Sequence, residues 1–217
     1  MTSSGATFST LTVELSGGIG RLTLNQPDQL NPLGSDALTE IAKAARWFDD
    51  EGARVVVITS AGDRAFSAGF DLRELTRGSD EAPDVDLGYL MVDAVEAMDA
   101  ITIAAIHGHC VGGGILLAVG CDLRIAADNT RFSIPEVDLG IPLAWGGIPR
   151  LVREVGPAVT RELVMTCRPF DAVEAQGLGM VNRVVPRDRL RAETDELASS
   201  LAAKPVSLLR TTKRQVH

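Results

Sequence analysis

The sequence contains little cysteine, few aromatic residues and no long hydrophobic run. Its 217 residues include three cysteines, Cys110, Cys121 and Cys167, and only 4% aromatic residues. An odd number of cysteines without metal-type spacing argues against a disulfide framework or a zinc site, and predicts three buried thiols. No stretch approaches the roughly 20 apolar residues that span a bilayer, so we expect no membrane partner.

Basic residues are also scarce relative to acidic ones. The chain has 21 Lys and Arg against 29 Asp and Glu, a net charge of −8. This balance gives no basic face for nucleic acid, so no nucleic-acid partner is expected.

The first five residues have neither the basic nor the apolar region of a signal peptide, which predicts a cytoplasmic protein. The length favours one main domain.

Apolar runs and turn residues predict an alternating β/α chain. Segments 11–15 and 21–24 alternate as in a hairpin, and Ser35 is expected to cap the helix that follows. The continuous apolar runs 55–58 and 101–106 predict strands covered on both faces. Further elements are expected as strands at 123–126 and 180–185, helices near 115–120 and 145–150, and two helices after Pro186. The acidic segment 77–86 predicts a surface loop that could border a ligand site.

Two glycine-rich segments carry the clearest chemical signal. They are Phe66-Ser67-Ala68-Gly69-Phe70-Asp71 and Cys110-Val111-Gly112-Gly113-Gly114, and each follows a strand-like run. Small residues there let a substrate approach two backbone N–H groups, as in an oxyanion hole for a thioester enolate. Either segment alone is more typical of a packing turn. No phosphate-binding Lys follows the glycines, and the chain has no Gly-x-Ser-x-Gly elbow, so neither a P-loop nor a hydrolase triad is supported.

One carboxylate lies among apolar residues. Glu136 falls in segment 132–142, where desolvation would raise its pKa and suit it to proton transfer near neutral pH. A structural Glu at a helix start or strand edge is the alternative. Asp138 is a weaker second candidate. His107 and His109 are expected to be structural, and Trp145 a core or pocket-wall aromatic.

Taken together, these segments resemble the crotonase superfamily, the enoyl-CoA hydratase/isomerase family, over essentially the whole chain. The resemblance implies an α/β fold, a crotonase-like spiral of stacked ββα units. It also implies a core domain at 1–186, a C-terminal helical region at 187–217 that is shorter than in the family, and a homotrimer or dimer of trimers. The expected ligand is an acyl-CoA thioester of fatty acid metabolism, with no metal and no cofactor, because coenzyme A is part of the substrate. The matching segments are 65–72, 107–114, 121–124, 135–136 and 177–186.

The same resemblance implies roles for individual residues. The backbone N–H groups of Ala68 and Gly113 would form the oxyanion hole, and Glu136 would be the catalytic acid/base. The substrate would be bound by Ala68, Gly69, Phe70, Asp71 and Gly113. Lys213 and Arg214, near the end of the chain, could meet phosphates.

Departures from the family pattern narrow the reaction. The first of the two hydratase glutamates is replaced by Leu116, which leaves one carboxylate and favours an isomerase that shifts a 3-enoyl-CoA double bond to the 2-position. The extra acid of dienoyl isomerases is replaced by Ala144 or Trp145, and only Asp138 is near the place of a dehalogenase nucleophile. A low-efficiency hydratase, a decarboxylase and a non-catalytic acyl-CoA binding protein remain open.

Overall fold

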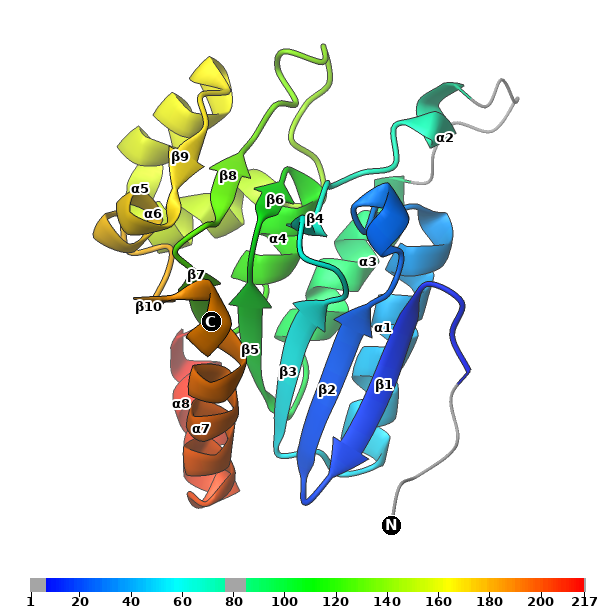
Figure 1. Cartoon of the computed structure of the whole chain (residues 1–217), viewed down its shortest axis with the longest axis vertical. Helices are drawn as coiled ribbons and strands as arrows, with labels where there is room; N and C mark the ends of the chain where they lie inside the picture. The colour runs from blue at the N-terminus through cyan, green and yellow to red at the C-terminus, as the bar shows by residue number, and fades with distance from the viewer. Residues whose placement is uncertain (1–6, 77–84, 217) are drawn as a thin grey trace.

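A computed structural model of the chain describes residues 7–76 and 85–216 (Figure 1). Its larger sheet has six strands in the order β1-β2-β3-β5-β7-β10. β1 and β2 form an antiparallel hairpin, and the other neighbours pair in parallel. The strands are β1 (Leu11–Ser16), β2 (Ile19–Leu24), β3 (Val55–Ser60), β5 (Ile101–Ile106), β7 (Leu123–Ala127) and β10 (Arg183–Val185).

A smaller sheet continues the chain beyond the carboxyl ends of three of these strands. Its order is β4-β6-β8-β9, and each of the first three strands directly follows a strand of the larger sheet. A helix then returns the chain to the larger sheet, which repeats a strand–strand–helix unit and confirms the predicted spiral of ββα units. The strands are β4 (Ala65–Ser67), β6 (His109–Val111), β8 (Arg131–Ser133) and β9 (Phe170–Asp171).

Helices cover both faces of the larger sheet (Figure 1). α1 (Ser35–Asp50) and α3 (Val85–Glu96) pack together on one face, and α7 (Leu190–Ala202) packs against β3, β5 and β7 on the other. Burial on both faces explains the continuous apolar runs of β3 and β5. The remaining helices are α2 (Arg73–Thr76), α4 (Gly113–Val119), α5 (Gly147–Thr166), α6 (Ala172–Gly177) and α8 (Val206–Val216), with short 3₁₀ turns at Pro27–Gln29 and Arg187–Arg189.

Most predicted elements are present, and two differ in detail. The predicted cap of α1 is wrong, because the N-cap is Gly34 and the Ser35 hydroxyl instead donates to Glu74 Oε2 at 2.9 Å. The strand predicted at 180–185 begins only at Arg183, because the Met180 N–H donates to the Ala175 carbonyl at 3.0 Å. All three cysteines are buried, as predicted.

Two further predictions concern the acidic loop at 77–86 and the domain boundary at residue 186. Residues 77–84 of the predicted acidic loop lie outside the described residues, whereas Val85 and Asp86 begin α3. The domain boundary at residue 186 stays a prediction, and the helices after it pack on the larger sheet. No helix in the described ranges is both long and apolar enough to cross a bilayer.

Candidate active site

The two glycine-rich segments meet where the smaller sheet ends. β4 leads into residues 68–71, β6 leads into 112–114, and these two strands pair in parallel. A Cβ built on Gly69 would lie 2.6 Å from the Val111 carbonyl oxygen and 3.3 Å from the Gly113 nitrogen. Gly69 also has a φ of +82°, which disfavours any other residue. The two backbones therefore touch, and glycine permits the contact.

Some backbone N–H groups at this junction already donate a hydrogen bond within the protein, and others do not. The Ala68 N–H donates to the Leu30 carbonyl at 2.9 Å, and the Gly69 N–H donates to Ser67 Oγ at 3.1 Å. No acceptor among the described residues is recorded for the N–H groups of Phe70 and Gly113, and Gly113 is the first residue of α4. The engagement of the Ala68 N–H argues against its predicted place in the oxyanion hole, and the next unengaged N–H is that of Phe70.

Glu136 lies directly beside this junction. It begins the turn after β8, and the Gly112 N–H donates to the Ser133 carbonyl at 2.9 Å, which ties that strand to the start of α4. A Cβ on Gly112 would overlap Glu136 Oε1, so the carboxylate rests against the Gly112 backbone. Gly112 has a φ of +47°, another reason for glycine there.

The environment of Glu136 favours its protonated form. Its Oε2 atom is buried and has no hydrogen-bond partner within the described part of the chain. Burial raises the pKa of this carboxyl above its ordinary value, and a hydrogen bond from its own backbone N–H opposes the rise. This is the environment that the sequence predicted for a proton-transfer group.

Apolar side chains surround the start of α4. Leu116, one turn after Gly112 and Gly113, is 1% exposed, and its Cδ2 would lie 2.9 Å from a Cβ built on Gly147. Trp145 is 8% exposed, and a Cβ on Gly113 would overlap its ring. The position at which the sequence resemblance implies a first glutamate is therefore occupied by a buried hydrocarbon side chain.

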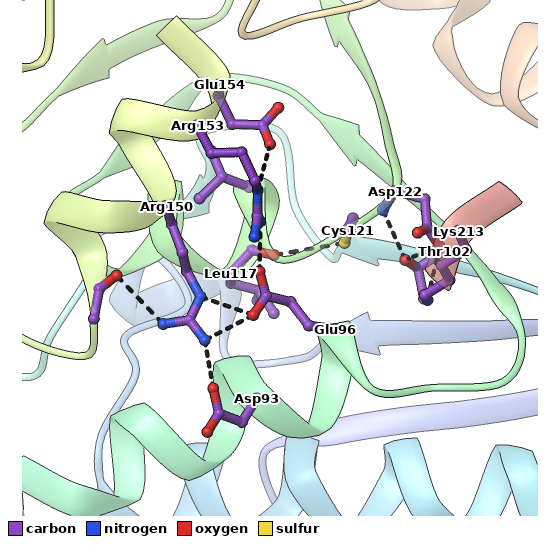
Figure 2. Close-up of polar contacts among 12 residues, drawn as sticks. Asp93, Glu96, Thr102, Leu117, Cys121, Asp122, Arg150, Arg153, Glu154 and Lys213 are labelled. Carbon is purple, nitrogen blue, oxygen red and sulfur yellow. Dashed lines mark hydrogen bonds and ion pairs between the residues drawn. The ribbon is translucent and has the colours of Figure 1, made fainter. Parts of the chain in front are cut away.

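Arg150 on α5 joins the turn that carries Trp145 to two carboxylates of α3, and Figure 2 shows the arginine between Glu96 and Asp93. The Arg150 Nη1 atom donates to the carbonyls of Trp145 at 3.0 Å and Gly146 at 3.3 Å. Its Nε atom donates to Glu96 Oε2 at 3.0 Å, and its Nη2 atom pairs with Glu96 and with Asp93, both on α3. Sequence reasoning missed this role, because it depends on two carboxylates from a different helix.

The other predicted residues lie outside this cluster or serve the fold. Asp138 is exposed, and Asp71 forms an ion pair with Arg73. His109 is exposed at the start of β6. His107 is buried with Nε2 2.8 Å from the Gly62 carbonyl oxygen, and burial lowers its pKa, as expected for a structural histidine.

A separate cleft of about 510 Å³ lies between the end of α3 and α8; it contains none of the predicted oxyanion, acid/base or acyl-binding residues, but Lys213 and Arg214 line it. Its cationic side chains are already paired: Arg210 and Arg214 with Asp99, and Lys213 with Asp122. Lys213 is buried, so its predicted contact with a phosphate is not supported.

Comparison with known proteins places this arrangement in a family. The family model described as Enoyl-CoA hydratase/isomerase matches residues 14–217. A probable enoyl-CoA hydratase of Mycobacterium tuberculosis is 36% identical over 212 residues, which are 97% of this chain and 82% of that protein. The chain belongs to the enoyl-CoA hydratase/isomerase family.

Solved structures agree with this assignment. An enoyl-CoA hydratase subunit of Geobacillus kaustophilus superimposes with a TM-score of 0.88 at 36% identity, covering 96% of this chain and 81% of that one. A putative enoyl-CoA hydratase of Thermobifida fusca, crystallised in complex with CoA, superimposes with a TM-score of 0.87 at 32% identity, covering 94% and 83%. The crotonase-like fold predicted from the sequence is therefore confirmed.

Proposed function

We propose that this protein is an acyl-CoA isomerase that moves the double bond of a 3-enoyl-CoA to the 2-position. The observation that carries the proposal is the half-buried Glu136, whose Oε2 atom is enclosed, beside the start of α4, together with the buried hydrocarbon side chain of Leu116 on the same helix. An acyl-CoA substrate is supported by family membership and by the CoA complex of the Thermobifida fusca protein.

In the proposed reaction, the N–H groups of Phe70 and Gly113 donate to the thioester oxygen. Both lie where the backbones of the two glycine segments touch, and Gly113 adds the positive end of α4. As the α-proton leaves, negative charge builds on that oxygen, and each donor is expected to stabilise it by about 3–4 kcal/mol. Phe70 takes the place that the sequence reasoning gave to Ala68.

Glu136 would carry the proton. As a carboxylate it removes the α-proton of the 3-enoyl thioester, which forms the dienolate, and as a carboxylic acid it returns a proton to the γ-carbon. The raised pKa of Glu136 suits both proton transfers. While the dienolate exists, Glu136 carries the proton, and a raised pKa makes this protonated carboxyl less costly near neutral pH. One carboxylate suffices, since no water is added.

Hydration of a 2-enoyl-CoA is the second candidate. The names of the similar proteins favour it, because both the Mycobacterium tuberculosis relative and the Geobacillus kaustophilus structure are named hydratases. In this chain, Glu136 would have to activate the water and protonate the α-carbon without the carboxylate that Leu116 replaces. We therefore expect hydration to be the slower reaction.

The test is conversion of 3-hexenoyl-CoA to its conjugated isomer, followed by absorbance, for the wild-type protein, Glu136→Gln and Asp138→Asn. Glu136→Gln should lose activity by about 10²–10⁴-fold, as for removal of a general base. Asp138→Asn, which removes an exposed carboxylate two residues away, should keep it. Equal turnover by wild type and Glu136→Gln would refute the role of Glu136. Absent turnover with intact binding of butyryl-CoA would favour decarboxylation or a non-catalytic binding role.

A further inference from the structure

The indole ring of Trp145 lies between two glycines of different helices. A Cβ on Gly88, in the first turn of α3, would overlap the ring from one side, and a Cβ on Gly113 would overlap it from another. Neither glycine has a positive φ, so conformational freedom does not explain them. Their common feature is that they leave room for the ring, which therefore fills the space between α3 and the start of α4.

The ring is held in place from several directions. Its edge meets the Phe70 ring with centroids 6.1 Å apart and planes at 79°. Its backbone has a φ of +55°, uncommon for a bulky residue, and Arg150 holds the carbonyl through the bond at 3.0 Å. The indole ring could change its position only if α3 or the turn at 145–147 moved. Trp145 is thus a fixed wall rather than an adaptable side chain.

The position of this wall relative to the proposed oxyanion donors gives it a role. Phe70 and Gly113, whose N–H groups would hold the thioester oxygen, both lie against the indole ring. The acyl chain extends from the thioester carbon, which would lie beside Glu136. The first carbons of the chain therefore lie within reach of the indole ring. Leu116 closes the neighbouring side of α4, and both side chains are buried.

We propose that Trp145 is a specificity-determining residue that limits the substrate to short acyl chains. This inference rests on the proposed acyl-CoA function of the site. Longer chains normally bind more tightly, by about fourfold for each additional buried methylene. A wall at Trp145 reverses this trend, since carbons beyond the wall can enter only if the ring or its neighbours α3 and α4 are displaced.

The experiment measures dissociation constants by calorimetry for butyryl-, hexanoyl- and octanoyl-CoA, which are saturated and cannot react. The proteins are the wild type, Trp145→Phe, Trp145→Ala and the control Trp47→Phe, which changes the half-buried tryptophan of α1. Wild type and Trp47→Phe should bind butyryl-CoA at least tenfold more tightly than octanoyl-CoA. Trp145→Ala should reverse this order, and Trp145→Phe should lie between.

The outcomes separate this inference from the proposed function. A wild-type affinity that stays equal or rises with chain length would overturn the inference by itself, even if Trp145→Ala did not fold. A folded Trp145→Ala protein with the wild-type profile would overturn it too. Both results leave the isomerase proposal standing, because binding of the thioester is retained. Failure of the wild type to bind any of the three ligands would overturn the acyl-CoA function and the inference together.

Discussion

At the scale of single residues, the site depends on a carboxylate that is kept from water. Glu136 has one oxygen buried without a partner in the described structure, and it lies against a glycine whose missing side chain makes room for it. Such burial costs free energy when the group is ionised. The cost is consistent with a group retained for proton transfer rather than for stability.

This cost predicts a pH-dependent gain in stability for Glu136→Gln. The pKa of Glu136 is raised in the folded protein, so stability is highest below the unfolded pKa and falls as pH rises through the folded one. At pH 7 the variant should be more stable than wild type by on the order of 1 kcal/mol. Near pH 4, where glutamate is largely protonated in both states, the difference should become much smaller. Urea denaturation at pH 7 and pH 4 measures it, and an equal difference at both would contradict the account.

The contact between the two glycine segments gives a second prediction at this scale. Gly69→Ala should lose about 1–3 kcal/mol of stability, because its φ is +82° and its Cβ would crowd the Val111 carbonyl. Isomerase activity should fall as well, since the shift moves the Phe70 and Gly113 N–H groups apart. Gly177→Ala is the control, because nothing lies within 4 Å of its Cβ position. Thermal unfolding and turnover are measured for both variants. Equal losses of stability and activity in Gly69→Ala and Gly177→Ala would argue against the contact.

At the scale of elements, α3 and α5 are joined by a buried arginine. Arg150 is 7% exposed and connects Glu96 and Asp93 with the backbone of the turn at 145–147 (Figure 2). Burial of a guanidinium is tolerated when carboxylates and carbonyls satisfy its donors. The arrangement therefore fixes the turn that carries Trp145 against the start of α4.

Removing this connection should be costly. Arg150→Met is expected to lose about 3 kcal/mol, because Asp93 and Glu96 lose their shared cation and two backbone carbonyls lose a donor. Arg153→Met is the matched control: it also pairs with Glu96 but is more exposed, and should lose less than about 1 kcal/mol. Urea denaturation of both variants measures the two losses of stability. A larger loss for Arg153→Met would contradict the role of Arg150 as the main connection between α3 and α5.

Local patterns predicted the elements better than the contacts between them. The hairpin and the strands β3 and β5 follow from alternation and apolar runs that are complete within a few residues. The cap of α1 was missed because Glu74, from a distant part of the chain, takes the Ser35 hydroxyl. The bond from the Ala68 N–H to the Leu30 carbonyl could not be predicted for the same reason, since Leu30 lies far away in the sequence. The desolvation of Glu136 could be predicted because its sequence neighbours are apolar, whereas its role as acid/base stays a prediction.

At the scale of the whole molecule, α8 is fastened to the larger sheet by a buried ion pair. Lys213 Nζ lies 2.9 Å from Asp122 Oδ2 and 3.1 Å from the Ala100 carbonyl. The same carboxylate oxygen accepts from the Thr102 N–H at 2.7 Å, so one network joins α8 to β5 and to the turn before β7 (Figure 2). The C-terminal helix is therefore part of the folded unit that carries the site.

Breaking this pair should destabilise the protein without altering the proposed chemistry. Lys213→Met should lose about 3 kcal/mol, because Asp122 keeps its charge and loses its cation. Adding Asp122→Asn should recover part of the loss, since the uncompensated charge is removed. Chemical denaturation of the two single variants and the double variant gives the coupling. Strictly additive losses would mean that the two side chains do not depend on each other.

The measurement that tests the central claim most directly compares two rates in one preparation of the wild-type protein. These are kcat/KM for conversion of 3-hexenoyl-CoA to 2-hexenoyl-CoA and kcat/KM for hydration of 2-hexenoyl-CoA. With Glu136 as the proposed single acid/base and Leu116 in place of a second carboxylate, isomerisation should be faster by at least about tenfold. Hydration that equals or exceeds isomerisation would contradict the single-carboxylate account.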